Sequence, residues 1–303
     1  MKKIILSLFC LASTVFAVAG PGSSLEVGGR MGIGALLPVT EFEVDYTPAF
    51  AGGFDLNYTY MFNDFFGFTT GVNISFLNSS IASNNILSHY SGEMTFINHY
   101  TNIAETKNVR CVGKTESLRE EYKATFFEIP LFLAIHNDQW YYNIGYKIGV
   151  PIKMNADFDR GPTTMMVDYI YDYGGYSLED NPLPIDDATD PGTKGDYDVY
   201  KNRSKSVFLL FALEIGYKFD VSNHGAISIG AYIDYGINNA QLGNPETSEL
   251  LTLNGANVER YNGAMNSNLM TSVRYYKAGV RILYNLGFGN SHGGGGRHNK
   301  RLL

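Results

Sequence analysis

The sequence is poor in cysteine and in positive charge, and each shortage excludes a class of protein. Cys10 and Cys111 are the only two cysteines among 303 residues, and Cys10 lies in the N-terminal segment discussed below. The rest of the chain therefore cannot form an intrachain disulfide. The 23 basic residues face 30 acidic ones, which gives a net charge of -7. Phosphate binding needs clustered lysine and arginine, so nucleic acid is not expected as a partner.

Long apolar runs and the short catalytic motifs are also missing. Mean hydropathy is -0.12, and no stretch is long and apolar enough for a helical membrane span. The chain has no Gly-rich phosphate loop, no His-Glu-x-x-His, no Cys-x-x-Cys pair and no Gly-x-Ser-x-Gly. We therefore expect no catalytic residues, no cofactor and no metal site.

The N-terminus is typical of a secretory signal peptide. Lys2 and Lys3 precede an apolar stretch over 4–11, and Ala17-Val18-Ala19 fits a cleavage site before Gly20. Residues 1–19 are therefore predicted to be removed. The mature chain then has 21 basic and 30 acidic residues, a net charge of -9.

Alternation of apolar and polar side chains is what the sequence has in abundance. Such alternation indicates β-strands, because successive side chains in a strand point to opposite faces. Eight stretches show it, over about 25–37, 49–62, 66–76, 122–135, 140–153, 207–219, 227–238 and 276–288. In each of them the apolar set is large and often aromatic, which suits a face in contact with lipid.

The connections between these stretches alternate between short and long. Those near 63–64, 137–138 and 221–224 are tight, whereas those near 38–48, 78–120, 154–205 and 239–270 are interpreted as long loops. Outer-membrane barrels have short periplasmic turns and long extracellular loops. The pattern predicts an all-β, eight-stranded antiparallel up-and-down transmembrane β-barrel over 20–289, with four long extracellular loops and a flexible, Gly-rich basic tail over 290–303.

Aromatic residues gather near the expected short turns, as an aromatic girdle at a membrane interface would. They are Tyr58, Tyr60, Phe62, Phe66, Phe68, Trp140, Tyr142, Tyr217 and Phe219. Outward aromatic rows also suit the interface between two packed sheets. A secreted β-sandwich or a ligand-binding barrel is therefore an alternative.

The inward face of the predicted barrel carries charges of both signs. An eight-stranded barrel has an interior that side chains can fill, and buried charges are costly unless they are paired. We predict an interior charge network of Arg30, Asp55, Glu128, Lys147, Glu214, Lys218, Asp234, Lys277 and Arg281. A plug of ion pairs is favoured over a path that conducts protons or ions.

Three stretches resemble the PorT-like outer-membrane barrels of Bacteroidota. They are Phe126-Phe127-Glu128-Ile129-Pro130-Leu131-Phe132-Leu133, the following strand with Gly145, Gly149 and Pro151, and the closing Ala278-Gly279-Val280-Arg281-Ile282-Leu283-Tyr284. The resemblance implies a barrel in the outer membrane, inserted by the barrel-assembly machinery and surrounded by lipid including lipopolysaccharide. It implies no shared catalytic residues. The tail beyond Gly289 departs from family chains that end near the last strand.

Pro130 cannot donate to a β-ladder, so a bulge or a locally opened pairing is expected there.

These observations favour a non-enzymatic function in envelope structure, in an export assembly, or in binding a protein or surface ligand through the loops. The alternative is a lipid A-modifying enzyme, because His89, Ser91 and Glu93 lie close together in one predicted loop. The acidic stretch over 179–198 is interpreted as a solvated surface rather than a calcium site, because its spacing matches no EF-hand.

Overall fold

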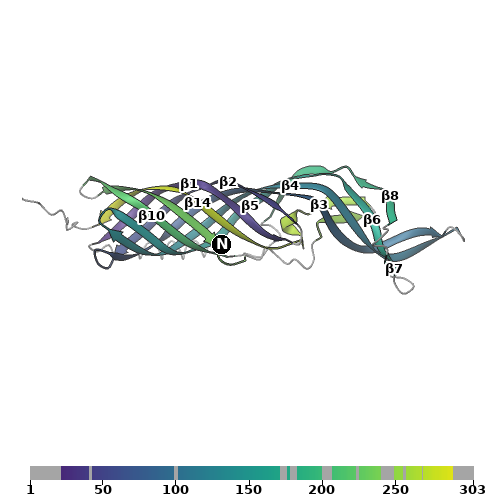
Figure 1. Ribbon diagram of the computed structural model, residues 1–303, viewed down its shortest axis with the longest axis horizontal. Helices are drawn as coiled ribbons and strands as arrows, with labels where there is room; N and C mark the ends of the chain where they lie inside the picture. The colour runs from purple at the N-terminus through teal and green to yellow at the C-terminus, as the bar shows by residue number, and fades with distance from the viewer. Residues whose placement is uncertain are drawn as a thin grey trace, which may run out of the picture.

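Eight long strands form one closed antiparallel barrel in the computed structural model (Figure 1). They are β1 (Ser23–Thr40), β2 (Asp45–Met61), β3 (Phe66–Asn98), β4 (Ile103–Asn137), β5 (Trp140–Arg160), β10 (Phe208–Ser222), β11 (Gly225–Gly236) and β14 (Met270–Phe288). The structure describes residues 22–40, 43–98, 102–170, 176–177, 183–199, 207–222, 225–239, 249–254, 257–267 and 269–288. The expected signal peptide (1–19) and tail (290–303) lie outside these residues.

Every barrel strand pairs with its two neighbours along the chain, and β14 returns to β1. The closing ladder runs from Ser23 opposite Phe288 to Thr40 opposite Met270, and β4 joins β5 directly. The prediction of an all-β, eight-stranded up-and-down barrel is therefore confirmed. Within the described ranges, no helix is long and apolar enough to cross a bilayer.

Two tight turns lie at the same end of the barrel as Ser23 and Phe288, which we call the turn end. The side-chain oxygen of Asn63 accepts hydrogen bonds from the backbone N–H groups of Phe65 (2.8 Å) and Phe66 (2.7 Å). In the β4–β5 turn, Asp138 adopts a φ of 54°, a left-handed conformation that aspartate tolerates better than most residues. Short polar side chains thus set both turns.

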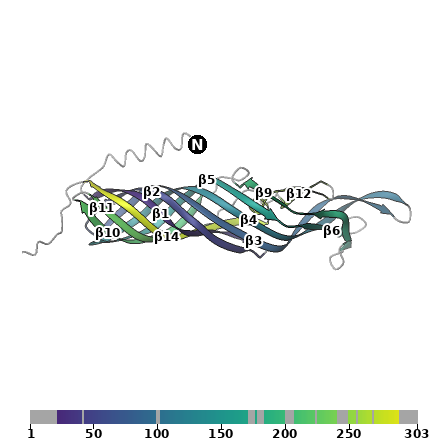
Figure 2. The same ribbon diagram turned by 90° about the horizontal axis from the view of Figure 1, so that it is seen from above.

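The opposite, distal end differs from the prediction, because the expected loops over 78–120 and 154–205 contain further strands. β3 and β4 continue as one long hairpin that extends beyond the barrel (Figure 2). β5 continues to Arg160 and is followed by β6 (Thr163–Ile170), β7 (Tyr176–Ser177), β8 (Leu183–Asp190) and β9 (Thr193–Asp198). The expected connection over 38–48 is also mostly strand, because β1 ends at Thr40 and β2 begins at Asp45.

The reason for this error is visible along β4, where both faces change character while the ladder continues. The inward face carries Leu118, Tyr122 and Phe126 in the distal half and Glu128 nearer the turn end. The outward face carries exposed Lys123 in the distal half and apolar Leu131 further down. A search for outward apolar alternation stops where the outer face becomes polar, although the strand does not.

Two irregularities adjust the neighbouring ladders. The ladder between β3 and β4 is interrupted between the pairs Thr70–Leu131 and Asn73–Glu128, and its register is the same on both sides of the gap. The pairing therefore opens locally at Pro130, and no bulge forms there. The bulge lies instead between β4 and β5, where Ile152 is the extra residue. Because of this extra residue, the inward-facing side chains of β5 are at odd-numbered positions up to Pro151 and at even-numbered positions from Met154.

The connection between β11 and β14 contains a small unit that does not join the barrel sheet. Among the residues that the structure describes, its strands β12 (Leu251–Asn254) and β13 (Asn257–Tyr261) pair only with each other, and the 3-10 turn η3 (Ala264–Asn266) follows. We call residues 249–254 and 257–267 the insert. Its buried side chains pack into the apolar interior of the distal half.

The seam between β1 and β14 predicts a strict size limit at Gly279. Gly279 lies opposite Gly32, and a Cβ atom on either glycine would collide with the backbone of the other strand. We expect Gly279→Leu to prevent closure, since overpacking costs about 1–3 kcal/mol or more. An unboiled closed barrel migrates faster on gels than the same protein after boiling. The faster band should therefore be lost in Gly279→Leu. The neighbouring outward change Val280→Leu should keep it, and a normal shift in Gly279→Leu would contradict the prediction.

Candidate functional site: the ion-pair network inside the barrel

The structure brings eight of the nine predicted interior residues into one connected network. Their side chains are at most 1% exposed and come from seven different strands. They are Arg30, Asp55, Glu128, Lys147, Glu214, Asp234, Lys277 and Arg281.

Asp55 on β2 connects the two arginines of the network. Nε of Arg30 on β1 donates to Oδ1 of Asp55 at 2.9 Å, and Nε of Arg281 on β14 donates to Oδ2 at 3.1 Å. Both carboxylate oxygens are therefore in use. One acid on β2 thus fixes the side chains of the two strands that close the barrel.

Lys147 on β5 makes the corresponding connection on the other side. Its Nζ lies 2.8 Å from Oδ1 of Asp234 on β11 and 3.2 Å from Oε1 of Glu214 on β10. Glu214 also binds Arg281, and Asp234 lies 3.4 Å from Nη1 of Arg30. The contacts form a closed ring of six alternating charges: Arg30, Asp55, Arg281, Glu214, Lys147 and Asp234.

A second carboxylate-lysine pair lies against this ring on the distal side. Lys277 on β14 binds Glu128 on β4, and its Nζ lies 3.4 Å from Oδ2 of Asp234. Glu128 also accepts hydrogen bonds from the hydroxyls of Ser75 on β3 and Tyr275, the latter at 3.1 Å. With Ser75, all eight barrel strands contribute to the network.

The prediction missed one member of the network and misplaced another. Glu26 on β1 is buried and its Oε2 lies 3.7 Å from Nη2 of Arg281. The alternation in β1 places Glu26 on the same inward face as Arg30, and this could have identified it. Lys218 does not join the network. Its Nζ lies 3.1 Å from Nε2 of His136 and 5.7 Å from the ring centroid of Tyr141, near the turn end.

Three aromatic rings form a layer directly distal to the network. The rings of Phe126 and Tyr275 are stacked with centroids 4.7 Å apart, and Phe208 contacts both edge-on at 5.5 and 5.0 Å. All three side chains are buried. The interior thus passes from paired charge to aromatic rings and then to the apolar distal core.

This arrangement is suited to filling and bracing the barrel. Five carboxylates contact four cations, and each cation lies near at least two carboxylates. Buried charges paired in this way avoid the large cost of an isolated buried ion. Among the described residues, no group of three His, Cys, Asp or Glu side chains is arranged to hold a metal.

The two loop candidates from the sequence lie on the distal half. His89 and Ser91 are on the exposed face of β3, and Nδ1 of His89 lies 3.8 Å from Oδ2 of Asp168. Asp168 is already bound by Arg110, at 2.8 Å from Nη2. In the acidic stretch, Asp190 pairs with Arg160 at 2.6 Å; the side chains of residues 179–189 are outside the described part of the chain.

Comparison with known proteins identifies no family for this chain. No protein-family description and no curated protein sequence matches it. Among solved structures, it is similar to Ail, the attachment invasion locus protein of Yersinia pestis, at 10% identity and a TM-score of 0.34, over 88% of this chain and all of that one. A TodX deltaS2S3 mutant monoaromatic hydrocarbon channel is also found at 10% identity and a TM-score of 0.18, over 90% and 92% of the two chains. The fold is therefore assigned from the strand pairing of this chain and not from these similarities.

Asp234 is the carboxylate of the network that contacts three cations, so its removal should be costly. Asp234→Asn leaves Arg30, Lys147 and Lys277 with less compensating charge, and breaking a buried pair typically costs about 3–5 kcal/mol. We expect a clear fall in the urea concentration that unfolds the refolded protein in detergent. Asp157→Asn breaks an exposed pair with Lys123 and should leave the midpoint unchanged. Equal effects of the two changes would contradict the role given to the network.

Proposed function

We propose that this chain is an integral outer-membrane β-barrel protein that is sealed, non-enzymatic and active through its distal half. The observation that carries the proposal is the exposure of large apolar side chains around the barrel. A soluble protein rarely exposes a contiguous apolar patch of more than a few hundred Å². Here the exposed apolar residues lie on all eight barrel strands.

These residues form an apolar belt around the turn-end part of the barrel. Its members include Met31, Ile33, Phe50, Phe54, Ile74, Phe76, Leu131, Leu133, Ile144, Tyr146, Leu213, Ile215, Ile229, Ile233, Val280 and Ile282. On β3 the belt extends from Phe66 to Phe76, which matches the 9–11 residues of a tilted transmembrane strand. A secreted sandwich would bury such side chains between its sheets, so the belt disfavours that alternative.

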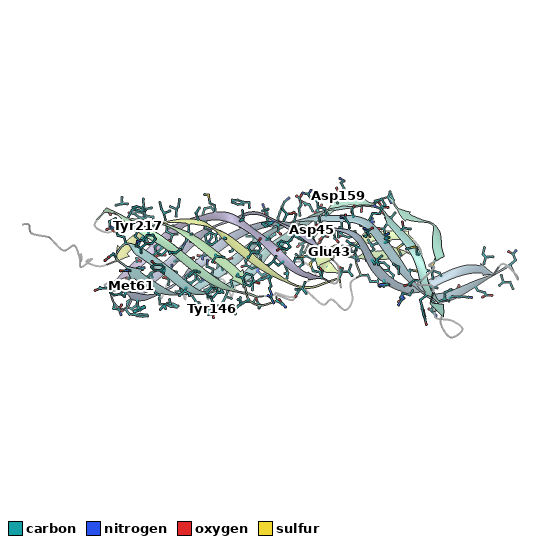
Figure 3. The ribbon with its side chains drawn as sticks, in the orientation of Figure 1. Glu43, Asp45, Met61, Tyr146, Asp159 and Tyr217 are labelled. Atoms are coloured by element: carbon teal, nitrogen blue, oxygen red, sulfur yellow. The ribbon has the colours of Figure 1, made fainter. Side chains whose placement is uncertain are left out.

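Both limits of the belt have the residues expected at a membrane interface. At the turn end, Trp140 contacts Tyr217 with ring centroids 5.4 Å apart, and Tyr217 contacts Phe219 at 4.8 Å. Figure 3 shows Tyr217 at this end, Tyr146 on the outer face of the barrel, and Asp45 and Asp159 on the distal side. The aromatic residues and the distal charges define a lipid-facing band between them.

The filled interior supports a sealed barrel rather than a channel. The ion-pair network, the aromatic layer of Phe126, Phe208 and Tyr275, and the apolar distal core follow one another along the axis. A permeating ion would have to separate paired charges and then pass an apolar layer. A structural or surface role fits this interior better than transport.

The position of His89 and Ser91 supports a non-enzymatic function. His89 lies thirteen positions beyond Phe76 on β3, and at about 3.3 Å per residue this is about 40 Å of strand. The acyl chains of lipid A would lie within the belt, far below this pair. A His-Ser hydrolase of lipid A would need its nucleophile near the membrane.

The finer assignments extend this proposal. Membership of the PorT-like group rests on the resemblance of the Phe126–Leu133 stretch and of the closing strand. Cleavage of residues 1–19, insertion by the barrel-assembly machinery and contact with lipopolysaccharide follow from the same placement. The distal half, with the long β3–β4 hairpin, would be the surface that meets a protein or other surface ligand outside the cell.

Fractionation of expressing cells tests the membrane assignment. We expect recovery in the outer membrane and a faster-migrating band without boiling. Ile74→Arg should destabilise the barrel by about 2–4 kcal/mol, because arginine is costly on the lipid face near the bilayer centre. Ala82→Arg lies on the same face of β3 but beyond the belt, and it should be neutral. Soluble recovery, or equal effects of the two arginines, would overturn the assignment.

Planar bilayer recordings test whether the barrel is sealed. Protein that shows the heat-dependent band shift should give no stepwise conductance, because the ionic and aromatic layers occupy its interior. The band shift serves as the control for folding in the same preparation. Regular single-channel steps from such protein would show that the interior conducts.

A further inference from the structure

The insert is a separate unit that fills the interior of the distal half. Its two strands pair only with each other among the described residues, so no β-ladder binds it to the barrel. Leu250, Leu251, Ala264 and Met265 are at most 1% exposed and belong to the same apolar core as β3, β4 and β5 residues. Side-chain packing and a few hydrogen bonds therefore hold it in place.

Glu120 of β4 makes the polar contacts that join the insert to the barrel. Its carboxyl group is fully buried. Oε1 accepts hydrogen bonds from the hydroxyl of Tyr261 at 2.5 Å and from the backbone N–H of Ala264 at 2.9 Å, and both donors belong to the insert. Oε2 accepts the hydroxyl of Tyr122 from β4 itself.

Among the described residues, no lysine, arginine or histidine makes an ion pair with this carboxyl group, and the buried Arg160 of β5, opposite Leu118 in the ladder, pairs with Asp190 instead. The titratable side chains around it are Tyr122 on β4, Tyr197 on β9 and Tyr261 on β13. The contrast with Asp55, Glu128, Glu214 and Asp234 is clear, because each of those carboxylates contacts at least two cations. Glu120 is thus a buried acid held by neutral donors alone.

The seat of the insert is shaped around these tyrosines. The ring of Phe158 on β5 lies 4.4 Å from that of Tyr261, and the ring of Tyr197 lies 6.3 Å from it. Gly263 has a φ of 89°, and a Cβ atom there would collide with the ring of Tyr197. The insert therefore fits one specific position, in which Tyr261 and Ala264 reach Glu120.

We propose that the insert is a releasable plug of the distal half, and that Glu120 is its pH-sensitive latch. Protonated Glu120 holds the insert in its seat. Ionisation places a buried charge with no ion-pair partner at this contact and favours release. Release would uncover the apolar interior lined by Leu118, Tyr122, Met154, Met165 and Val167.

The direction of the pH dependence follows from burial. Burial raises the pKa of Glu120 above its usual range, against the opposing effect of the hydrogen bonds from Tyr122, Tyr261 and Ala264. A raised pKa means that the docked state binds the proton more tightly than the released state. Docking is therefore strongest below the ordinary glutamate pKa of about 4.3, and it weakens as pH rises through the raised pKa.

Hydrogen exchange measured by mass spectrometry on the full-length protein in detergent micelles tests the latch. After correction for intrinsic exchange, the opening of the insert should increase up to tenfold per pH unit above about pH 4.3 and then level off. Peptides from β14 serve as the internal reference. Glu120→Gln should make the profile flat. A flat profile in the unmodified protein, or an unchanged slope in Glu120→Gln, would overturn the proposal.

Two further variants separate the latch from general instability. Glu121 lies next to Glu120 on β4 in an exposed pair with Arg119, and Glu121→Gln should leave the profile unchanged. Tyr261→Phe removes one donor to the carboxylate, so the levelling-off should move to higher pH. If Glu120→Gln does not fold, the test is the pH at which the exchange profile of Tyr261→Phe levels off. A levelling-off pH equal to that of the unmodified protein would contradict the latch.

The fluorescent dye 1-anilinonaphthalene-8-sulfonate, which binds to exposed apolar surfaces, tests whether release uncovers the interior. Dye fluorescence should rise with pH in parallel with the exchange of the insert, and it should remain low in Glu120→Gln. Exchange that increases without dye binding would show that the insert does not act as a plug of an apolar interior.

Discussion

Charge pairing inside the barrel is the constraint on which the rest of the structure depends. The six-membered ring of Arg30, Asp55, Arg281, Glu214, Lys147 and Asp234 closes only when six strands are in one register. A slip of one residue in any of them would turn its charge into the apolar belt. The network therefore specifies register around the barrel, in addition to filling it.

The glycines of the closing seam belong to the same constraint. Gly32 and Gly279 face each other where β1 meets β14, and neither position has room for a Cβ atom. Arg30 and Arg281 lie two residues away on the same strands and are also direct partners in the ladder. Close approach of the two strands and long inward side chains are thus complementary, and together they fill a narrow interior.

The two-residue alternation of apolar and polar side chains predicted much of this structure, because it determines which face of the sheet each side chain lies on. The alternation in β5 placed Lys147 inside the barrel, and eight of the nine residues assigned to the network on this basis contact one another. The face of the sheet on which a side chain lies does not identify the residues that it contacts, however. Lys218 has inward parity but lies near the turn end, where His136 and the ring of Tyr141 are its neighbours.

The distal half escaped prediction for a related reason. Polar outward residues on β3 and β4 resemble loop residues when an apolar outer face is the only signal sought. The strands nevertheless continue, with Tyr90 and Leu118 now forming an apolar interior. Glu120 was invisible from sequence because its donors, Tyr261 and Ala264, come from a segment more than 140 residues away.

The two halves of the molecule bury carboxyl groups by opposite means, and the difference has functional consequences. Inside the belt every acid of the ring contacts arginine or lysine, and removal of one partner would leave an uncompensated buried charge. In the distal half, the hydrogen bonds that Glu120 accepts from described residues come from hydroxyl and amide donors only. An acid held by cations loses its pairing when it accepts a proton, whereas an acid held by neutral donors can accept a proton without losing its hydrogen-bond partners. The first arrangement suits a permanent brace and the second suits a reversible contact.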